Sequence, residues 1–364
     1  AESERDLAIL SRRLRAGERA APLLRSALGT QRRLLGPDDP ETAFTQRHLA
    51  SLLRNRGDYE EAARLYRASL SAFEAAYPPG HPNILDVKNS LSVLLEQVGR
   101  FDEAVGLMRE VVDVQRRAAA ETETGIDAAR SATLATLGTL LREQGDLDGA
   151  EAAAREALGL NQTVFGDAHP ETATSYRNLA SILRDRGQYA EAARLYQAAI
   201  DIRREAFGPD HPRLANVLNS FSRLREAEGD IEGALVLSRQ ALRIFQAQPD
   251  AEPLRVGMAT SNLAGLYAQT GRAGEAEALH REALQLLRGS MPEGSADLAF
   301  PLVRLGTLMT EQGRFAEAAP LLREAVEIRR VALPPEHRYT ARAERRLSDA
   351  LVGLGRPADA RTVL

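Results

Sequence analysis

Apolar and small residues recur along the whole chain with a period of 42 residues, and one short tract marks each copy. Its copies read RGDYEEA, VGRFDEA, QGDLDGA, RGQYAEA, EGDIEGA, TGRAGEA, QGRFAEA and LGRPADA. The tract contains Gly57, Gly99, Gly145, Gly187, Gly229, Gly271, Gly313 and Gly355. Successive glycines are 42 residues apart, except that Gly145 follows Gly99 after 46. Such regular repetition predicts an array of equivalent structural units.

Each unit is predicted to contain two helices. In the unit around Gly187, a 3.6-residue apolar period predicts one helix over 170–185, and a second is expected over 189–207. The glycine between them suits a helix end. A second anchor, GPDDPETA at 36–43 or GPDHPRLA at 208–215, places proline in the first turn of the first helix. Asp39 and Asp167 precede such prolines and are expected to cap free amides.

Small residues recur where the two helices of a unit are expected to approach closely. In the first helix they are Ala50, Ser92, Gly138, Ala180, Ser222, Ala264, Gly306 and Ser348. In the second they are Ala62, Ala104, Ala150, Ala192, Ala234, Ala276, Ala318 and Ala360. The four-residue excess falls in 117–125 and predicts a longer second helix or a larger loop. Residues 1–16 are expected to belong to a starting unit.

The combined pattern resembles the tetratricopeptide repeat, and its long period with the GPDHP connector is similar to the repeats of kinesin light chains and their bacterial relatives. The resemblance covers essentially the whole chain. It implies an all-α fold, a right-handed α-solenoid of about nine helix-turn-helix units in a single domain, 1–364. The expected units are 1–39, 40–81, 82–127, 128–169, 170–211, 212–253, 254–295, 296–337 and a partial unit 338–364.

In this family the first helices line the concave surface. Residues 13, 10, 9 and 6 positions before each turn glycine share one stripe of the first helix. Seven arginines lie on this stripe against two acids, Asp86 and Asp349, although the chain has a net charge of −4. Asparagine amides can hold a peptide backbone, and arginine binds carboxylates through two parallel bonds. The expected peptide-binding residues are Arg47, Asn89, Arg177, Asn178, Asn219, Arg223, Asn262, Arg304, Arg345 and Arg346.

The stripe therefore predicts a groove for an extended and preferably acidic peptide. Similar asparagine and basic positions hold peptides in tetratricopeptide grooves, which supports this role for Asn178, Asn219 and Asn262. The alternative interpretation is a solvated polar face in an arginine-rich protein, because Glu96 and Glu226 lie beside the same stripe. Nucleic acid is a less favoured partner, since aromatic residues make up 5% of the chain and tryptophan is absent.

Several kinds of chemistry find no support in the sequence. There is no cysteine, and no HExxH, GxSxG or phosphate-loop signature occurs. Four of the six histidines lie in connectors and are expected to cap loops rather than bind metal. We expect no enzyme activity, cofactor, metal or membrane contact, and a cytoplasmic location, because neither a membrane span nor a signal peptide is apparent.

Two functions remain open on the sequence alone. One is a stand-alone adaptor that gathers partner proteins. The other is the sensor or regulatory arm of a larger effector, such as a protease or a nucleotide switch, in which ligand binding would bias the effector between states.

Overall fold

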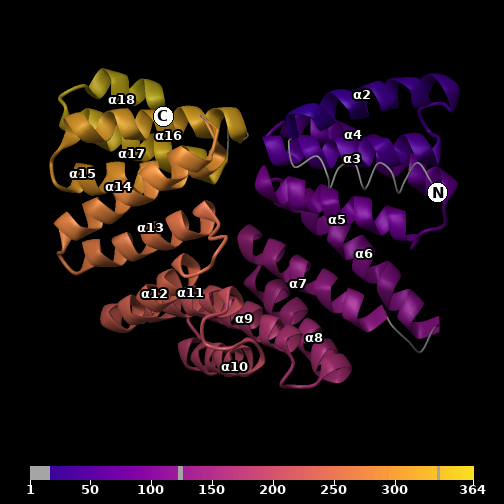
Figure 1. Ribbon diagram of the computed structural model, residues 1–364, viewed down its shortest axis with the longest axis horizontal. Coiled ribbons are helices and arrows are strands. Elements are labelled where there is room, and N and C mark those ends of the chain that lie inside the picture. Colours follow the sequence, from indigo (N-terminus) through magenta and orange to yellow (C-terminus); the bar gives the residue numbers. More distant parts are fainter. Residues whose placement is uncertain (1–16, 122–125, 293, 334–336) are drawn as a thin grey trace. The chain divides into compact units, whose positions relative to one another are not determined.

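The computed structural model describes residues 17–121, 126–292, 294–333 and 337–364, and every regular element within them is helical (Figure 1). The first helix of each unit is called helix A and the second helix B. The A helices are α3 (Pro40–Arg56), α5 (Pro82–Gln97), α7 (Ile126–Gln144), α9 (Pro170–Asp185), α11 (Pro212–Ala227), α13 (Pro253–Gln269), α15 (Ala299–Glu311) and α17 (Arg338–Gly353). The B helices are α2 (Gly17–Leu34), α4 (Tyr59–Ala76), α6 (Phe101–Glu121), α8 (Leu147–Phe165), α10 (Tyr189–Phe207), α12 (Ile231–Gln246), α14 (Ala273–Ser290), α16 (Phe315–Ala332) and α18 (Pro357–Val363).

The chain divides into two compact units, Ala1–Asp146 and Leu147–Leu364. The N-terminal unit contains α2 to α7, and the C-terminal unit contains α8 to α18 with a short 3₁₀ helix, η1 (Ala296–Leu298). Within each of these two compact units, A and B helices alternate along the chain. The predicted all-α repeat fold is therefore confirmed. That all of 1–364 forms one continuous solenoid domain stays a prediction. The starting unit expected in residues 1–16 lies outside the described residues.

The predicted helices around Gly187 are confirmed, since α9 and α10 have the expected bounds. Gly187 adopts φ 77°, a left-handed conformation that an L side chain rarely adopts. Its N–H donates to the Arg184 carbonyl at 2.9 Å, and the Gln188 N–H donates to the Leu183 carbonyl at 2.8 Å. This pair of bonds closes helix A by satisfying its last carbonyls. The extra residues near 117 lengthen α6 to 21 residues, against 18 in α4, and 122–125 lie outside the described residues.

The start of helix A is capped by one connector position, which histidine occupies in several units. The imidazole Nδ1 accepts the N–H two residues ahead at 3.1 to 3.3 Å in His81, His169, His211 and His337. Asp39 occupies the same position and accepts the Glu41 N–H at 2.9 Å, as predicted. The expected capping role of Asp167 is wrong, because His169 provides the cap and the Asp167 carboxylate instead accepts from the Gln162 side chain at 2.8 Å.

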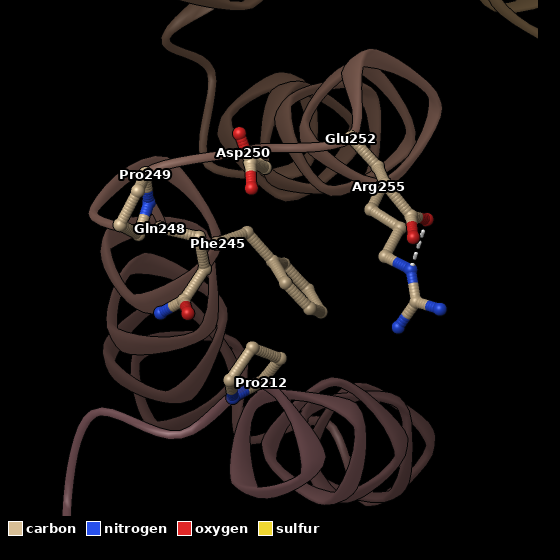
Figure 2. A pocket seen from close by; sticks show the side chains of 7 residues that line it. All are labelled: Pro212, Phe245, Gln248, Pro249, Asp250, Glu252 and Arg255. Atoms are coloured by element: carbon tan, nitrogen blue, oxygen red, sulfur yellow. Dashed lines mark hydrogen bonds and ion pairs between the residues drawn. The ribbon is translucent and has the colours of Figure 1, made fainter.

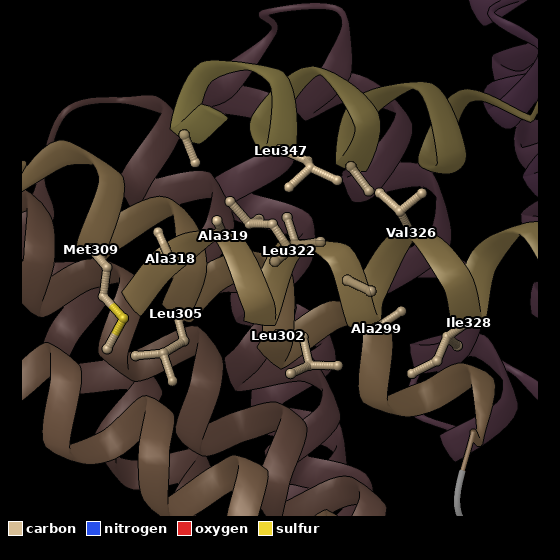
Figure 3. Close-up of a cluster of buried hydrophobic side chains, with 14 of the residues drawn as sticks. Ala299, Leu302, Leu305, Met309, Ala318, Ala319, Leu322, Val326, Ile328 and Leu347 are labelled. Carbon is tan, nitrogen blue, oxygen red and sulfur yellow. The ribbon is translucent and has the colours of Figure 1, made fainter. Parts of the chain in front are cut away.

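Small residues allow the two helices of a unit to pack closely. All eight of the predicted alanines in helix B are at most 3% exposed. Among the small residues predicted in helix A, Gly306 leaves no room for a side chain, since an added Cβ would lie 2.6 Å from Leu322 Cγ. Figure 3 shows the surrounding core, in which Leu302 and Leu305 of α15 face Ala318, Leu322 and Val326 of α16, with Leu347 of α17 above. Burial of such side chains is the main favourable term in folding.

At one position of helix B, polar side chains of α8, α10 and α16 connect a repeat to the one that follows it. The Asn161 amide donates to the Glu171 carbonyl at 3.3 Å, and the Arg203 guanidinium donates to the Arg213 carbonyl at 2.5 Å. Arg329 donates to the Tyr339 carbonyl in the same way. In each case the acceptor lies ten residues ahead, in the first turn of the following helix A. Burial, with repulsion from neighbouring arginines, lowers the pKa of Arg203 and of Arg329 to about 10.

Candidate functional site

The A helices lie on the more closely spaced side of the helix pairs. In the C-terminal unit α9 contacts α11, α13 contacts α15, and α15 contacts α17, whereas within the described residues no two successive B helices make comparable contact. A stack that is closer on one side curves toward that side. The stripe predicted from the sequence therefore lies on the helices that contact one another between successive repeats.

Four of the predicted binding residues converge on one recess of about 40 Å³ in the C-terminal unit. They are Asn219, Arg223, Asn262 and Arg304. Asn219 and Arg223 project from α11, Asn262 from α13 and Arg304 from α15, so three consecutive A helices contribute. The lining is completed by Ser222, Ser238, Gly265, Leu266 and Glu226. We call this the α11–α15 recess.

Positive charge dominates the electrostatics of the recess. Arg304 reaches solvent, yet the surrounding protein removes part of its hydration, and together with repulsion from Arg342 and Arg223 this lowers its pKa. Its guanidinium lies 5.2 Å from the centre of the Phe300 ring and over Gly265, where an added Cβ would be 3.6 Å from Nη1. Among the described residues neither a hydrogen bond nor an ion pair to a carboxylate is formed by Arg223, Arg304 or Arg342.

The acid among the described residues that line the recess is Glu226, one turn after Arg223 on α11. Its Oε1 accepts a hydrogen bond from Gln269 Nε2 of α13 at 2.5 Å, which joins the two A helices at the end of the recess. Glu226 partly offsets the repulsion on Arg304. Neither Glu226 nor Gln269 was among the predicted binding residues, although the sequence placed Glu226 next to the stripe.

The other predicted residues of the C-terminal unit flank the recess. Arg177 on α9 donates to the adjacent Asn178 side chain at 2.9 Å. On α17, Arg346 lies 3.8 Å from Asp349, while Arg345 is exposed. These residues extend the stripe at both ends of the unit but do not line the recess itself.

The two predicted residues of the N-terminal unit, Arg47 and Asn89, differ from those of the recess in their contacts. Arg47 forms an ion pair with Asp86 of the next helix A at 3.1 Å and lies over the Phe44 ring at 5.4 Å. Asn89 is half-buried on α5. Since both Arg47 and Asp86 belong to the predicted stripe, the charge of Arg47 is already compensated there.

Sequence reasoning gave no individual role to the buried pair formed by Ser261 and His280. His280 is 2% exposed, and its Nδ1 lies 3.1 Å from Ser261 Oγ. Burial, with a smaller contribution from the nearby Arg304 charge, lowers the pKa of His280 to about 4. The imidazole is therefore neutral near pH 7. The sequence feature that could have indicated this pair is a histidine, His280, at a core position of helix B.

A larger cavity of about 350 Å³ lies at the connector between α12 and α13. In Figure 2 the Phe245 ring points into the space between Pro212 and Arg255, and Arg255 pairs with Glu252 at 2.5 Å. The connector here reads QAQPDAEP and lacks the capping histidine. Elsewhere that histidine stacks on an aromatic ring, as His211 does on Phe207 with ring centres 4.6 Å apart. The cavity thus follows from a variant connector rather than from convergent polar groups.

Clustered metal ligands and membrane-spanning helices are both missing from the described residues. No group of three or more His, Asp or Glu side chains is placed to hold a metal ion in that part of the chain. None of the helices described there is long and apolar enough to span a lipid bilayer.

Alternating helix pairs that are joined by glycine turns and carry a polar stripe along the A helices define an α-helical repeat protein. The tetratricopeptide repeat family matches residues 1–75, 45–117, 129–205, 173–247, 255–330 and 297–364. The chain therefore belongs to the tetratricopeptide repeat family. Members of this family are generally non-enzymatic scaffolds that bind protein or peptide partners. No curated protein matches the chain.

Three solved structures are similar to the chain. The structure of the apo form of RapI has a TM-score of 0.57 at 14% identity, over 79% of this chain and 98% of that one. BtubC (BKLC) from P. vanneervenii has a TM-score of 0.48 at 23% identity, over 66% of this chain and 92% of that one. A putative kinesin light chain of Podospora anserina with nearly identical TPR-like repeats has a TM-score of 0.48 at 22% identity, over 58% and 98%. At these identities the likeness concerns the fold alone.

Proposed function

We propose that the chain is a protein-interaction scaffold whose C-terminal unit binds an extended, acidic segment of a partner along its A helices. The observation that carries this proposal is the α11–α15 recess, which Arg223 and Arg304 line together with Glu226, while Arg342 adds a further charge that repels Arg304. Mutual repulsion of like charges is relieved when an anion binds between them. An acidic segment is therefore favoured over a neutral or basic one.

The asparagines of the recess supply hydrogen-bonding groups for the backbone of a bound peptide. Asn219 and Asn262 each offer a carbonyl acceptor and an amide donor, which can pair with the N–H and C=O of an extended backbone. They lie on neighbouring A helices, so a bound segment would run across the helices. The backbone would be held by amides and the acidic side chains by guanidinium groups.

The proposal concerns the C-terminal unit because the two units differ in free charge. Arg47 in the N-terminal unit is paired with Asp86, so a ligand carboxylate would have to displace an existing partner. An arginine whose charge is unmatched gains more from an anionic ligand than one that is already paired.

The test uses the full chain and a fluorescein-labelled dodecapeptide of alternating Glu and Gly, compared with its Gln and Arg counterparts by fluorescence polarisation. The Glu peptide should bind, and binding should weaken at least tenfold between 50 and 200 mM salt, about the loss expected when several charge contacts are screened. The double variant Arg177→Glu with Arg304→Glu should bind at least tenfold more weakly and keep its helical circular dichroism.

The matched control is Arg243→Glu with Arg288→Glu, which makes the same charge change on B helices α12 and α14. This control should bind the Glu peptide as the parent chain does. Equal affinity for the Glu and Gln peptides, or equal weakening in both double variants, would contradict the proposal.

A further inference from the structure

We propose that Arg223, Arg304 and Arg342, which we call the arginine cluster, recognise a phosphorylated side chain, such as phosphoserine, on the bound segment. This inference rests on the function proposed above and names the chemical group that the site prefers. A carboxylate peptide would occupy the same groove with lower affinity.

The first argument is the charge balance of the cluster. Arg223 and Arg304 line the recess together with one carboxylate, that of Glu226, and Arg342 adds a third positive charge that repels Arg304. Taken together, the three guanidinium charges exceed the carboxylate charge by two. A glutamate side chain supplies one negative charge, whereas a phosphoserine supplies about 1.5 to 2 at neutral pH. The dianion therefore neutralises the cluster more completely than any single unmodified acidic side chain.

The second argument is the size and lining of the recess. Its volume of about 40 Å³ can be compared with the roughly 10–15 Å³ that one water-sized group requires. The space thus accepts a group larger than a single water molecule. The Asn219 and Asn262 amides line the same space and can donate to the oxygens of a phosphoryl group.

The third argument is the type of basic residue. The planar guanidinium group presents two parallel N–H donors that match two phosphate oxygens, and it is more weakly hydrated than the lysine ammonium. The cluster contains arginine alone. Arg304 is already held in place over the Phe300 ring, so little side-chain freedom is lost when it binds.

A phosphorylated protein segment fits the site better than a nucleic acid. Single-stranded nucleic acid is held largely by bases that stack on aromatic side chains. Among the described residues that line the recess there is no aromatic side chain, and the face of Phe300 is covered by Arg304. The asparagine pair, by contrast, suits a peptide backbone.

The test compares three fluorescein-labelled heptapeptides with the full chain. Each has the sequence Gly-Ser-Gly-X-Gly-Ser-Gly, with X as phosphoserine, glutamate or serine, and the affinity is measured by fluorescence polarisation. The phosphoserine peptide should bind at least tenfold more tightly than the glutamate peptide. Inorganic phosphate at 10 mM should displace it, while acetate at the same concentration should not.

The variants Arg304→Gln and Arg342→Gln should each remove most of the preference for phosphoserine over glutamate. Arg288→Gln is the control, because Arg288 lies on α14, paired with Glu324. Circular dichroism establishes that each variant is folded.

Each outcome has a defined meaning. Equal binding of the phosphoserine and glutamate peptides would overturn this inference and leave the acidic groove intact. Failure of both these peptides and the Glu-Gly dodecapeptide to bind would overturn the proposed function as well. Tighter, Arg304-dependent binding of an eight-nucleotide oligouridine than of the phosphoserine peptide would assign the cluster to nucleic acid and overturn the inference.

Discussion

His280 Nδ1 lies 3.1 Å from Ser261 Oγ, and this buried contact joins α14 to α13 close to the guanidinium of Arg304. The imidazole has almost no access to water, and a positive charge lies nearby. Any proton added to His280 in the folded state is therefore opposed first by burial and then by repulsion.

The first prediction concerns stability in acid. Burial, with Arg304, lowers the pKa of His280 to about 4, against about 6.5 in an unfolded chain. Between these values the unfolded state binds more protons, so the free energy of unfolding falls as the pH drops from 6.5 to 4. The full loss is about 3 kcal/mol. Urea denaturation of the parent chain and His280→Gln at pH 7, 5.5 and 4.5 should show a flatter pH dependence in the variant. Parallel curves would mean that His280 has the same pKa in both states.

The second prediction concerns the close contact at Gly306. Gly306→Ala places a Cβ 2.6 Å from Leu322 Cγ, in a core where Leu322 is fully buried. Overpacking of this kind costs about 1–3 kcal/mol. Gly159→Ala is the matched control, since nothing lies within 4 Å of the added Cβ and alanine favours the helix. Thermal unfolding should show a lower Tm for the first variant and an equal or higher Tm for the second. A reversed order would show that α15 and α16 separate at little cost.

The third prediction concerns the histidine caps. His211→Ala removes the acceptor for the Arg213 N–H and the stacking on Phe207, so it should cost about 1 kcal/mol in the free energy of unfolding. His211→Asp should retain most of that stability, because Asp39 caps α3 from the same position. Chemical denaturation measures both. Equal losses in the two variants would show that the ring stacking, and not the cap, stabilises the connector.

The fourth prediction concerns the buried arginine of α10. Arg203→Leu should change the free energy of unfolding by about 1 kcal/mol or less, because a well-packed apolar side chain often replaces a buried charge without loss. Leu287 occupies the equivalent position of α14 and is fully buried. Arg203→Ala should cost about 2–5 kcal/mol, since it leaves a cavity. Denaturant midpoints distinguish the two, and a leucine variant no more stable than the alanine variant would show that the bond to the Arg213 carbonyl is indispensable.

The regular parts of the fold could be predicted from the sequence because each rests on local chemistry. The bounds of α9 and α10 follow from a proline, a glycine and a 3.6-residue apolar period. The Asp167 cap could not be predicted correctly, because His169 is closer to the helix start and its Nδ1 has the acceptor geometry that a carboxylate usually provides. Residue type alone favoured the aspartate.

The candidate site could be predicted only in part. Their positions before the turn glycine identified Asn219, Arg223, Asn262 and Arg304 as stripe residues. The structure brings these four residues together. The same rule predicted Arg47 as a binding residue. It could not predict that Arg47 pairs with Asp86, because that ion pair depends on side chains of two different repeats. The bond between Glu226 and Gln269 likewise joins residues 43 positions apart, and the 42-residue period does not predict which long side chains meet.

The polar position of helix B has a practical consequence for dividing the chain into fragments. The side chains of Asn161, Arg203 and Arg329 each donate to a carbonyl of the following repeat, so a cut directly after α8, α10 or α16 would expose a polar group that water can hydrate. Phe245 and Leu287 hold the same place in α12 and α14 and make no such bond. Shortened versions of the array should therefore terminate after α8, α10 or α16, because an end after α12 or α14 would expose Phe245 or Leu287 to water.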